Sequence, residues 1–294
     1  MVSIILVNYN GSEDTMDCIK SLEQISYTDY RIIVVDNFST DSSYAVLEEF
    51  NKTHDFVLLQ AGANEGFSAG NNVGIKYALD CGTDYVLLLN NDTVVEKDFL
   101  EYIIKGFEID SNVGVSIGKI LYYSQPNTIW YAGGSLNNKT ARTEHWGYGE
   151  ENNDQYDKTS FVTFATGCCM CISRKTLEQV GLLDESFFLY EEDVEYCKRV
   201  TDAGFKMVYE PKSVIYHKVS ASTGQGSRMS QYYLVRNKYS FVRGGFCGLN
   251  KLTAYLYCTA LFAFRCIKGE MKVKYCLAGY KAFLRKEKGR ALRF

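Results

Sequence analysis

The chain has 294 residues, of which 46% are hydrophobic and 23% charged, with only two prolines. This composition excludes a largely disordered protein and allows one large globular domain, alone or with an appendage. The net charge of −3 hides an asymmetry, because Arg236 to Phe294 holds 14 lysines and arginines against two acids, while the whole chain has 32 against 35. An acidic body with a basic tail indicates that the tail meets something anionic.

The first sixty residues alternate between predicted strands and helices. Val2 to Val7 is an apolar run without a basic leader, which predicts a first strand rather than a signal peptide. Arg31 to Val35 and Phe56 to Leu59 predict the next two strands, and helix-capping residues follow the first two strands. A β-α-β-α-β order predicts an α/β fold with a doubly wound, mostly parallel sheet.

Polar residues follow these strands at their carboxyl ends. Asn8 and Asp36 follow the first two strands, and Asn90-Asn91-Asp92 follows a fourth apolar run, Tyr85 to Leu89. Open α/β sheets bind ligands at this edge, and a carboxylate beside amide oxygens suits Mg²⁺ or Mn²⁺. The simpler alternative is that Asp92 or Thr93 caps a following helix.

A loop rich in glycine and amides precedes the fourth strand. It begins at Asn64 and contains Gly66 and Gly70, which permit close backbone approach, and the start of the following helix attracts anions. A plain glycine-rich turn is the alternative. No G-x-G-x-x-G follows the first strand, so a dinucleotide cofactor is not expected.

Three consecutive acids, Glu191, Glu192 and Asp193, begin a predicted helix directly after the apolar run Phe187 to Tyr190. The helix dipole favours carboxylates in a first turn, so simple capping is one interpretation. An apolar wall beside a carboxylate also raises its pKa, which favours a general base. Both interpretations stay open on the residues alone.

The remaining segments carry weaker signals. Phe161 to Ser173 predicts one buried strand, and the polar stretch Asn137 to Ser160 predicts a loop that covers an acceptor. Trp130 suits either stacking on a sugar ring or simple packing. His217 ends a predicted strand, where a lone histidine is either structural or a ligand. Three of the ten cysteines, Cys168, Cys169 and Cys171, cluster inside an apolar run, so we expect buried thiols rather than disulfides or zinc, in a reducing cytoplasm.

The basic tail mixes lysines and arginines with apolar residues. Leu252 to Phe264 is apolar apart from two threonines, but it falls short of the roughly 20 residues that span a bilayer. We expect amphipathic helices in residues 250–294 that lie on an anionic membrane surface. The alternative is a helical hairpin that packs on the core or in a homodimer interface.

Several ordered motifs resemble one known family. The segments Asn8-Tyr-Asn-Gly11, Val35-Asp36-Asn37-x-Ser39-x-Asp41, Asn64-x-Gly66-Phe-x-x-Gly70-Asn71-Asn72 and Leu-Asn90-Asn91-Asp92 are similar to family 2 glycosyltransferases of the GT-A fold. The nearest likeness is to the rhamnosyltransferase-like branch of bacterial surface-polysaccharide synthesis. The resemblance implies a GT-A domain over residues 1–245, with a nucleotide-sugar-binding half (1–95) and an acceptor and catalytic half (96–245). Residues 246–294 would then form a C-terminal helical extension.

The resemblance also implies roles for individual residues. Asp36 would meet the nucleoside, Asp92 would bind a divalent cation, and His217 would reach the metal or the diphosphate. In the Glu-Asp motif, Asp193 would be the catalytic base and Glu192 would orient the acceptor or the base. Many members of the family have an acid at the position of Asn90. In this chain Asn90 is an amide, which leaves Asp92 as the one carboxylate of Asn90-Asn91-Asp92. The other expected substrate contacts are Asn8, Asn10, Asn64, Gly66, Gly70, Asn71, Asn90, Asn91, Gly167 and Arg236, with phosphate contacts from Ser220, Ser222 and Thr223.

The implied reaction is an inverting, metal-dependent transfer of a sugar from a dTDP- or UDP-linked donor to a hydroxyl of a saccharide acceptor. The acceptor would be lipid-linked and met at the cytoplasmic face of a membrane. A nucleotidyltransferase would show a glycine-rich basic loop after the first strand, which Asn-Tyr-Asn-Gly is not. A non-catalytic sugar-nucleotide or polysaccharide-binding module would not need both Asp92 and Glu192-Asp193. The acidic body disfavours a nucleic-acid binder.

Overall fold

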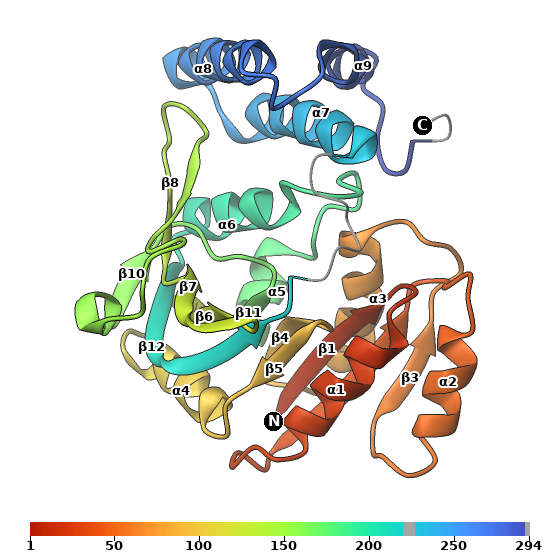
Figure 1. The fold of residues 1–294 in the computed structure, drawn as a ribbon. Coiled ribbons are helices and arrows are strands. Elements are labelled where there is room, and N and C mark those ends of the chain that lie inside the picture. The colour runs from red at the N-terminus through yellow and green to blue at the C-terminus, as the bar shows by residue number, and fades with distance from the viewer. Residues whose placement is uncertain (220–226, 292–294) are drawn as a thin grey trace.

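A mixed ten-stranded sheet forms the centre of the computed structural model, which describes residues 1–219 and 227–291 (Figure 1). Its strands lie in the order β10-β12-β6-β11-β4-β1-β2-β3, with β5 paired to β12 and β7 to β6, while β8 and β9 form a separate hairpin. The strands are β1 Val2–Asn8, β2 Tyr30–Asp36, β3 Val57–Gln60, β4 Tyr85–Asn90, β5 Thr93–Val95, β6 Val113–Tyr122, β7 Gln125–Tyr131, β8 Gly134–Leu136, β9 Thr143–His145, β10 Ser160–Val162, β11 Cys169–Ser173 and β12 Lys206–His217.

The strands β3, β2, β1 and β4 run parallel, which confirms the doubly wound half expected from the first ninety residues. Their continuous apolar sequences fit a sheet that is covered on both faces. Asn8 lies opposite Asp36 in the register of β1 and β2, and Val7 lies opposite Asn90 in that of β1 and β4. The polar residues that follow these strands therefore meet at one edge of the sheet.

The other half of the sheet departs from a simple parallel order. Instead of one strand over Phe161 to Ser173, the chain forms two short strands, β10 and β11, and β11 runs antiparallel between β4 and β6. No helix starts at Asp92, because Thr93–Val95 forms β5 and pairs with the end of β12. This pairing sets Thr93 opposite His217.

Nine α-helices lie within the described residues, and the last three, α7 to α9, form the C-terminal part of the described chain (Figure 1). The helix α7 follows the sheet and packs against α8 and α9, which lie above it in Figure 1. None of these helices, not even α8 with its 20 residues, combines the length and the apolar character that a bilayer-spanning helix requires within the described part of the chain. The helices are α1 Ser12–Leu22, α2 Ser43–Phe50, α3 Phe67–Asp80, α4 Phe99–Lys105, α5 Arg174–Val180, α6 Glu192–Asp202, α7 Arg228–Gly245, α8 Gly248–Ile267 and α9 Val273–Leu284.

All ten cysteines are free thiols, and seven of them are buried as expected, whereas Cys81 and Cys266 are partly exposed and Cys247 is exposed. Cys168, Cys169 and Cys171 are buried in and beside β11. Burial raises the pKa of the Cys169 thiol to about 12, so this thiol is protonated and unreactive at neutral pH.

Candidate active site

A chain of buried side-chain hydrogen bonds joins the ends of β1, β2 and β4. Asn8 Nδ2 donates to Asp36 Oδ1 (2.8 Å) and its Oδ1 accepts from Thr15 Oγ1 (3.0 Å). Asn91 Nδ2 in turn donates to Thr15 Oγ1 (2.9 Å). The Asp36 carboxylate also accepts from the backbone and hydroxyl of Ser39. These bonds hold the side chains of Asn8, Asp36 and Asn91 in place at the predicted edge of the sheet.

The loop before α3 is fastened to the same edge. Asn37 Nδ2 donates to Asn64 Oδ1 (3.2 Å) and to Gly66 O (3.1 Å), and Asn64 Oδ1 also accepts from Gly66 N (3.1 Å). At Gly70 a Cβ would come within 2.8 Å of Val7 Cγ1, so the start of α3 lies directly against β1. Nearer the surface, Asn10 is tied to Thr40 through both its amide nitrogen and its amide oxygen.

Gly66→Ala should lower the free energy of unfolding by about 2 kcal/mol or more, which corresponds to a fall in Tm of roughly 4–8 °C. Gly66 has φ +96°, in the left-handed region, and a Cβ there would overlap the backbone of Phe188. Gly62→Ala is the matched control, because a Cβ at Gly62 meets nothing within 4 Å. Thermal unfolding of both variants tests this, and equal Tm values would contradict the strain at Gly66.

The pairing of β5 with β12 brings together two predicted metal ligands that are 125 residues apart. His217 Nε2 lies 3.1 Å from Asp92 Oδ1, and both residues are buried. The rings of Trp130 and His217 are almost perpendicular, with centroids 4.8 Å apart, so Trp130 packs against the imidazole. Lys218 N donates to Asp92 O (2.9 Å), which holds the two segments in register.

The residues at this point fit a divalent cation. Asp92 supplies a carboxylate and His217 an imidazole, and the His217 Nδ1 atom is buried without a hydrogen-bond partner among the described residues. Within that same part of the chain, no three histidine, cysteine or acidic side chains form a complete metal cage. Mg²⁺ and Mn²⁺ sites that take one or two protein ligands complete their coordination with substrate phosphates and water, so two protein donors suit a site that handles a diphosphate.

The acidic turn, which consists of Glu191, Glu192 and Asp193, lies beside the start of β11. Asp193 Oδ2 accepts from Gly167 N (3.1 Å), and Asp193 Oδ1 accepts from Val194 N (2.8 Å). Asn90 N donates to Cys168 O (2.8 Å). Asn91 follows Asn90 and Gly167 precedes Cys168, so these two residues lie in segments that are next to each other. Asp193 and the Asp92 turn therefore border one region at the sheet edge.

Burial controls the ionisation of the acidic turn. Removal from solvent raises the pKa of Asp193, against hydrogen bonds from the backbone of Gly167 and Val194 that lower it. Burial, followed by repulsion from Asp193, raises the pKa of Glu192 well above its ordinary value. Glu192 Oε2 has no hydrogen-bond partner within the described residues. A carboxylate with a raised pKa is a stronger base once ionised, which suits proton abstraction.

Two residues that support this turn were not expected from the sequence. Asn237 on α7 donates from Nδ2 to the carbonyl oxygens of Leu189 (2.7 Å) and Tyr190 (3.0 Å). Its neighbour Lys238 forms an ion pair with Glu191 (2.6 Å). No local sequence signal pairs these segments, because Tyr190 and Asn237 lie 47 residues apart in the chain.

Two further residues that the sequence predicts to contact substrate, Arg236 and Asn71, bond to other parts of the protein. Arg236 is only 1% exposed, donates from Nη1 to Gly289 O (2.7 Å), and stacks over Tyr233 with its guanidinium carbon 4.7 Å from the ring centroid. Asn71 donates to Phe67 O (3.0 Å) within α3. Arg236 thus bonds to the segment after α9, and its predicted contact with a phosphate stays a prediction. The predicted phosphate contacts Ser220, Ser222 and Thr223 lie outside the described residues.

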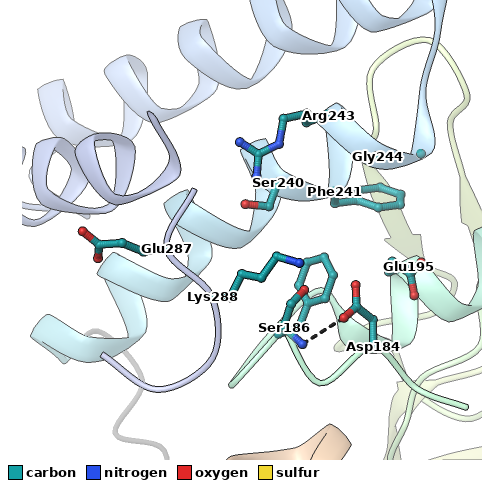
Figure 2. A pocket seen from close by; sticks show the side chains of 11 residues that line it. Asp184, Ser186, Glu195, Ser240, Phe241, Arg243, Gly244, Glu287 and Lys288 are labelled. Atoms are coloured by element: carbon teal, nitrogen blue, oxygen red, sulfur yellow. Dashed lines mark hydrogen bonds between the residues drawn. The ribbon is translucent and has the colours of Figure 1, made fainter. Parts of the chain in front are cut away.

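A cavity of about 220 Å³ lies between α7, the segment before α6 and the chain after α9, and Figure 2 shows the side chains that line it. Its lining includes Asp184 and Glu287 as well as Arg243 and Lys288, so charges of both signs face it. None of the residues predicted from the sequence to bind substrate or metal lines this cavity. The candidate active site is therefore the sheet edge around Asp92 and Asp193.

The strand order and the helices around the sheet define an α/β protein of the GT-A type. A family model described as glycosyl transferase family 2 matches residues 3–181, and the chain belongs to that family.

Relatives of known function support this assignment. The chain is 31% identical over 209 residues to the low-salt glycan biosynthesis hexosyltransferase Agl10 of Haloferax volcanii, covering 67% of this chain and 61% of that protein. It is 25% identical to a poly-beta-1,6-N-acetyl-D-glucosamine synthase of Staphylococcus epidermidis, over 76% of this chain and 51% of the synthase. It is 23% identical to the dTDP-rhamnosyl transferase RfbF of Shigella flexneri, over 81% and 79%. The chain thus spans about half to three-fifths of the first two relatives.

Solved structures share the fold. The mannosyltransferase PcManGT of Pyrobaculum calidifontis, solved with GDP-Man and Mn²⁺, superimposes with a TM-score of 0.60 at 16% identity, over 98% of this chain and 88% of that one. TarS residues 1–349 of S. aureus superimposes with a TM-score of 0.61 at 14% identity, over 97% and 80%. At these identities the likeness establishes the GT-A architecture alone.

Proposed function

We propose that the protein is an inverting, metal-dependent glycosyltransferase that moves a sugar from a nucleoside-diphosphate sugar to a hydroxyl of a saccharide acceptor. The observation that supports this most is the bond between Asn90 N and Cys168 O, which joins the segment of Asp92 to that of Gly167 and Asp193. A metal-suited acid and a base with a raised pKa thereby border one region. RfbF and PcManGT are named as transferases of rhamnosyl and mannosyl groups, which supports the same class of reaction.

In this proposal the chain's own residues divide the work. Asp193 takes the proton from the acceptor hydroxyl as its oxygen attacks the anomeric carbon, and Glu192 orients the acceptor. Asp92 and His217 hold a divalent cation, Mn²⁺ or Mg²⁺. When bound, this cation supplies positive charge that stabilises the departing diphosphate. The braced edge formed by Asn8, Asp36 and the Asn64 loop receives the nucleotide of a dTDP- or UDP-linked donor.

A thermal-shift panel of nucleotide sugars, each with and without Mn²⁺, tests this function. We expect one donor to raise the Tm in the presence of Mn²⁺, and the same donor to be consumed when an acceptor extract is added. A folded protein that no nucleotide or nucleotide sugar stabilises would instead favour a non-catalytic module that binds polysaccharide.

We further propose that the acceptor is lipid-linked and that the protein meets it at the cytoplasmic face of a membrane. Ten free thiols suit a reducing compartment. The helix α8 buries Ala254, Cys258 and Phe262 on one side, yet its opposite side is also apolar, with Leu256 63% exposed and Ile267 83% exposed. We call the exposed apolar side chains of α8 and α9 the outer face: Leu249, Leu252, Leu256, Phe264, Ile267, Val273, Leu277, Tyr280 and Leu284.

Basic residues accompany the outer face, which favours an anionic bilayer over an uncharged partner. Lys268, Lys272, Lys274 and Lys281 are exposed on or between α8 and α9. Apolar side chains that enter the headgroup region, together with lysines that meet anionic lipids, are typical of helices that lie on a membrane surface.

The wild type should bind vesicles that contain phosphatidylglycerol, and bind less well as salt rises. The double variant Leu252→Asp with Leu256→Asp should lower the partition coefficient about tenfold or more, because it replaces apolar contacts by charge. Ile109→Asp, at a position 47% exposed outside the outer face, is the control. Vesicle sedimentation and light scattering measure this. A wild type that ignores vesicles but forms a dimer that the double variant dissociates would assign the outer face to a second copy.

A further inference from the structure

A cavity of about 470 Å³ lies between the tip of the β8–β9 hairpin, the acidic turn before α6, and the helices α7 and α8. Its volume lies within the usual range for small-molecule pockets, about 300–1,000 Å³. Glu191, Lys238, Tyr257 and Leu261 line it beyond residues 3–181, the part that matches the family model. The cavity is therefore partly built by the C-terminal extension of this chain.

A buried ion pair forms one side of this cavity. Lys238 Nζ lies 2.6 Å from Glu191 Oε2, and the Lys238 and Glu191 side chains are only 13% and 8% exposed. Lys238 also donates to Ala141 O (3.1 Å) on the hairpin. An ammonium group has three donors and a carboxylate has two oxygens, so each partner keeps hydrogen-bonding capacity beyond this pair. A buried ion pair is a costly way to join two segments unless its remaining capacity is used.

The backbone at Glu191 supports a functional role. Tyr190 and Glu191 both have left-handed φ angles, 69° and 73°, which non-glycine residues adopt at a cost. The bonds from Asn237 hold this conformation. The same conformation sets the Glu191 carboxylate in the cavity lining two residues before Asp193.

The rest of the cavity lining mixes apolar side chains, hydroxyl groups and the basic side chain of Arg142. Tyr257 and Leu261 lie one turn apart on α8, and Thr140 and Thr143 add hydroxyls from the hairpin. Hydroxyl groups beside an aromatic ring and an apolar side chain match the two kinds of surface that a sugar ring presents.

We propose that this cavity binds a saccharide unit of the acceptor and so holds the acceptor hydroxyl toward Asp193. The proposal rests on the glycosyltransferase function argued above. The Glu191–Lys238 pair hydrogen-bonds the sugar's hydroxyls, and Tyr257 packs against its C–H face. This assigns acceptor recognition to α7, α8 and the β8–β9 hairpin, away from the nucleotide edge.

The test uses the full chain with its donor and Mn²⁺, and a panel of p-nitrophenyl glycosides of hexoses, deoxyhexoses and N-acetylhexosamines as probes. Saturation-transfer NMR should detect at least one glycoside, and Leu261→Trp, which fills the cavity, should weaken its binding at least tenfold. Ile109→Trp adds the same ring at an exposed position and should bind like the wild type. Glu191→Gln should weaken binding while Glu191→Asp retains part of it.

Donor binding separates the two claims. If the Mn²⁺-dependent donor shift survives in Leu261→Trp while glycoside binding is lost, the proposal stands. If the donor binds and no glycoside binds, or if Leu261→Trp binds glycosides as the wild type does, the cavity is not the acceptor subsite. If no donor binds the wild type, the proposed function fails first.

Discussion

Asp193→Asn should lower kcat by about 10²- to 10⁴-fold, the usual contribution of a general base, while the donor binds as in the wild type. The amide keeps the size of the side chain, and its one oxygen can still accept from one of the two backbone N–H groups, those of Gly167 and Val194, that bond to Asp193. It cannot take a proton from the acceptor hydroxyl. Initial rates with the donor identified in the thermal-shift panel, beside the donor's Kd, measure the two effects separately.

The control for this variant is Asp202→Asn at the far end of the same helix, where the carboxylate pairs with Lys198 at the surface. It should retain wild-type kcat. A wild-type rate in Asp193→Asn would remove the base from Asp193 and transfer attention to its neighbours Glu191 and Glu192.

The pH profile gives an independent readout of the same group. Burial raises the pKa of Asp193, and a base acts in its deprotonated form. Activity should therefore be full at pH values above this raised pKa and fall as the pH drops through it. The fall should occur at a higher pH than the titration of an ordinary aspartate, and it forms the acidic limb of the profile. The Asp193→Asn variant should lack this limb.

Asp92→Ala should abolish the effect of Mn²⁺ on donor binding and weaken that binding by about 100-fold or more, equivalent to the several kcal/mol that a metal contributes through charge. The variant removes the carboxylate that lies 3.1 Å from His217 Nε2. Thermal shifts and calorimetric titration of the donor, each with Mn²⁺ and with EDTA, measure it.

Asp98→Asn is the matched control for Asp92→Ala, because Asp98 is an exposed carboxylate six residues further along the same segment. It should keep the Mn²⁺ response. A Mn²⁺-dependent shift that survives in Asp92→Ala would show that the cation is held elsewhere. His217→Ala should give an intermediate loss, because the carboxylate remains.

Local pattern alone predicted the parallel half of the sheet. β1, β2 and β4 are continuous apolar runs that end in polar residues, and buried parallel strands leave such runs in the sequence whatever surrounds them. The same pattern placed Asn8, Asp36 and Asp92 at one edge. It failed beyond Asp92, where β5 replaces the expected helix start, because a strand of three residues forms only when a partner, here β12, is already beside it.

The sequence by itself determined the α/β class, the residue types at the sheet edge and the acidic turn, because each is written in a short stretch of chain. Only the tertiary structure decided which of them meet. The pairing of β5 with β12 brings Asp92 to His217, and the hydrogen bond from Gly167 N positions Asp193. Arg236 hydrogen-bonds to the backbone of Gly289. Contacts between residues so far apart depend on strand order and helix packing, which no local pattern encodes.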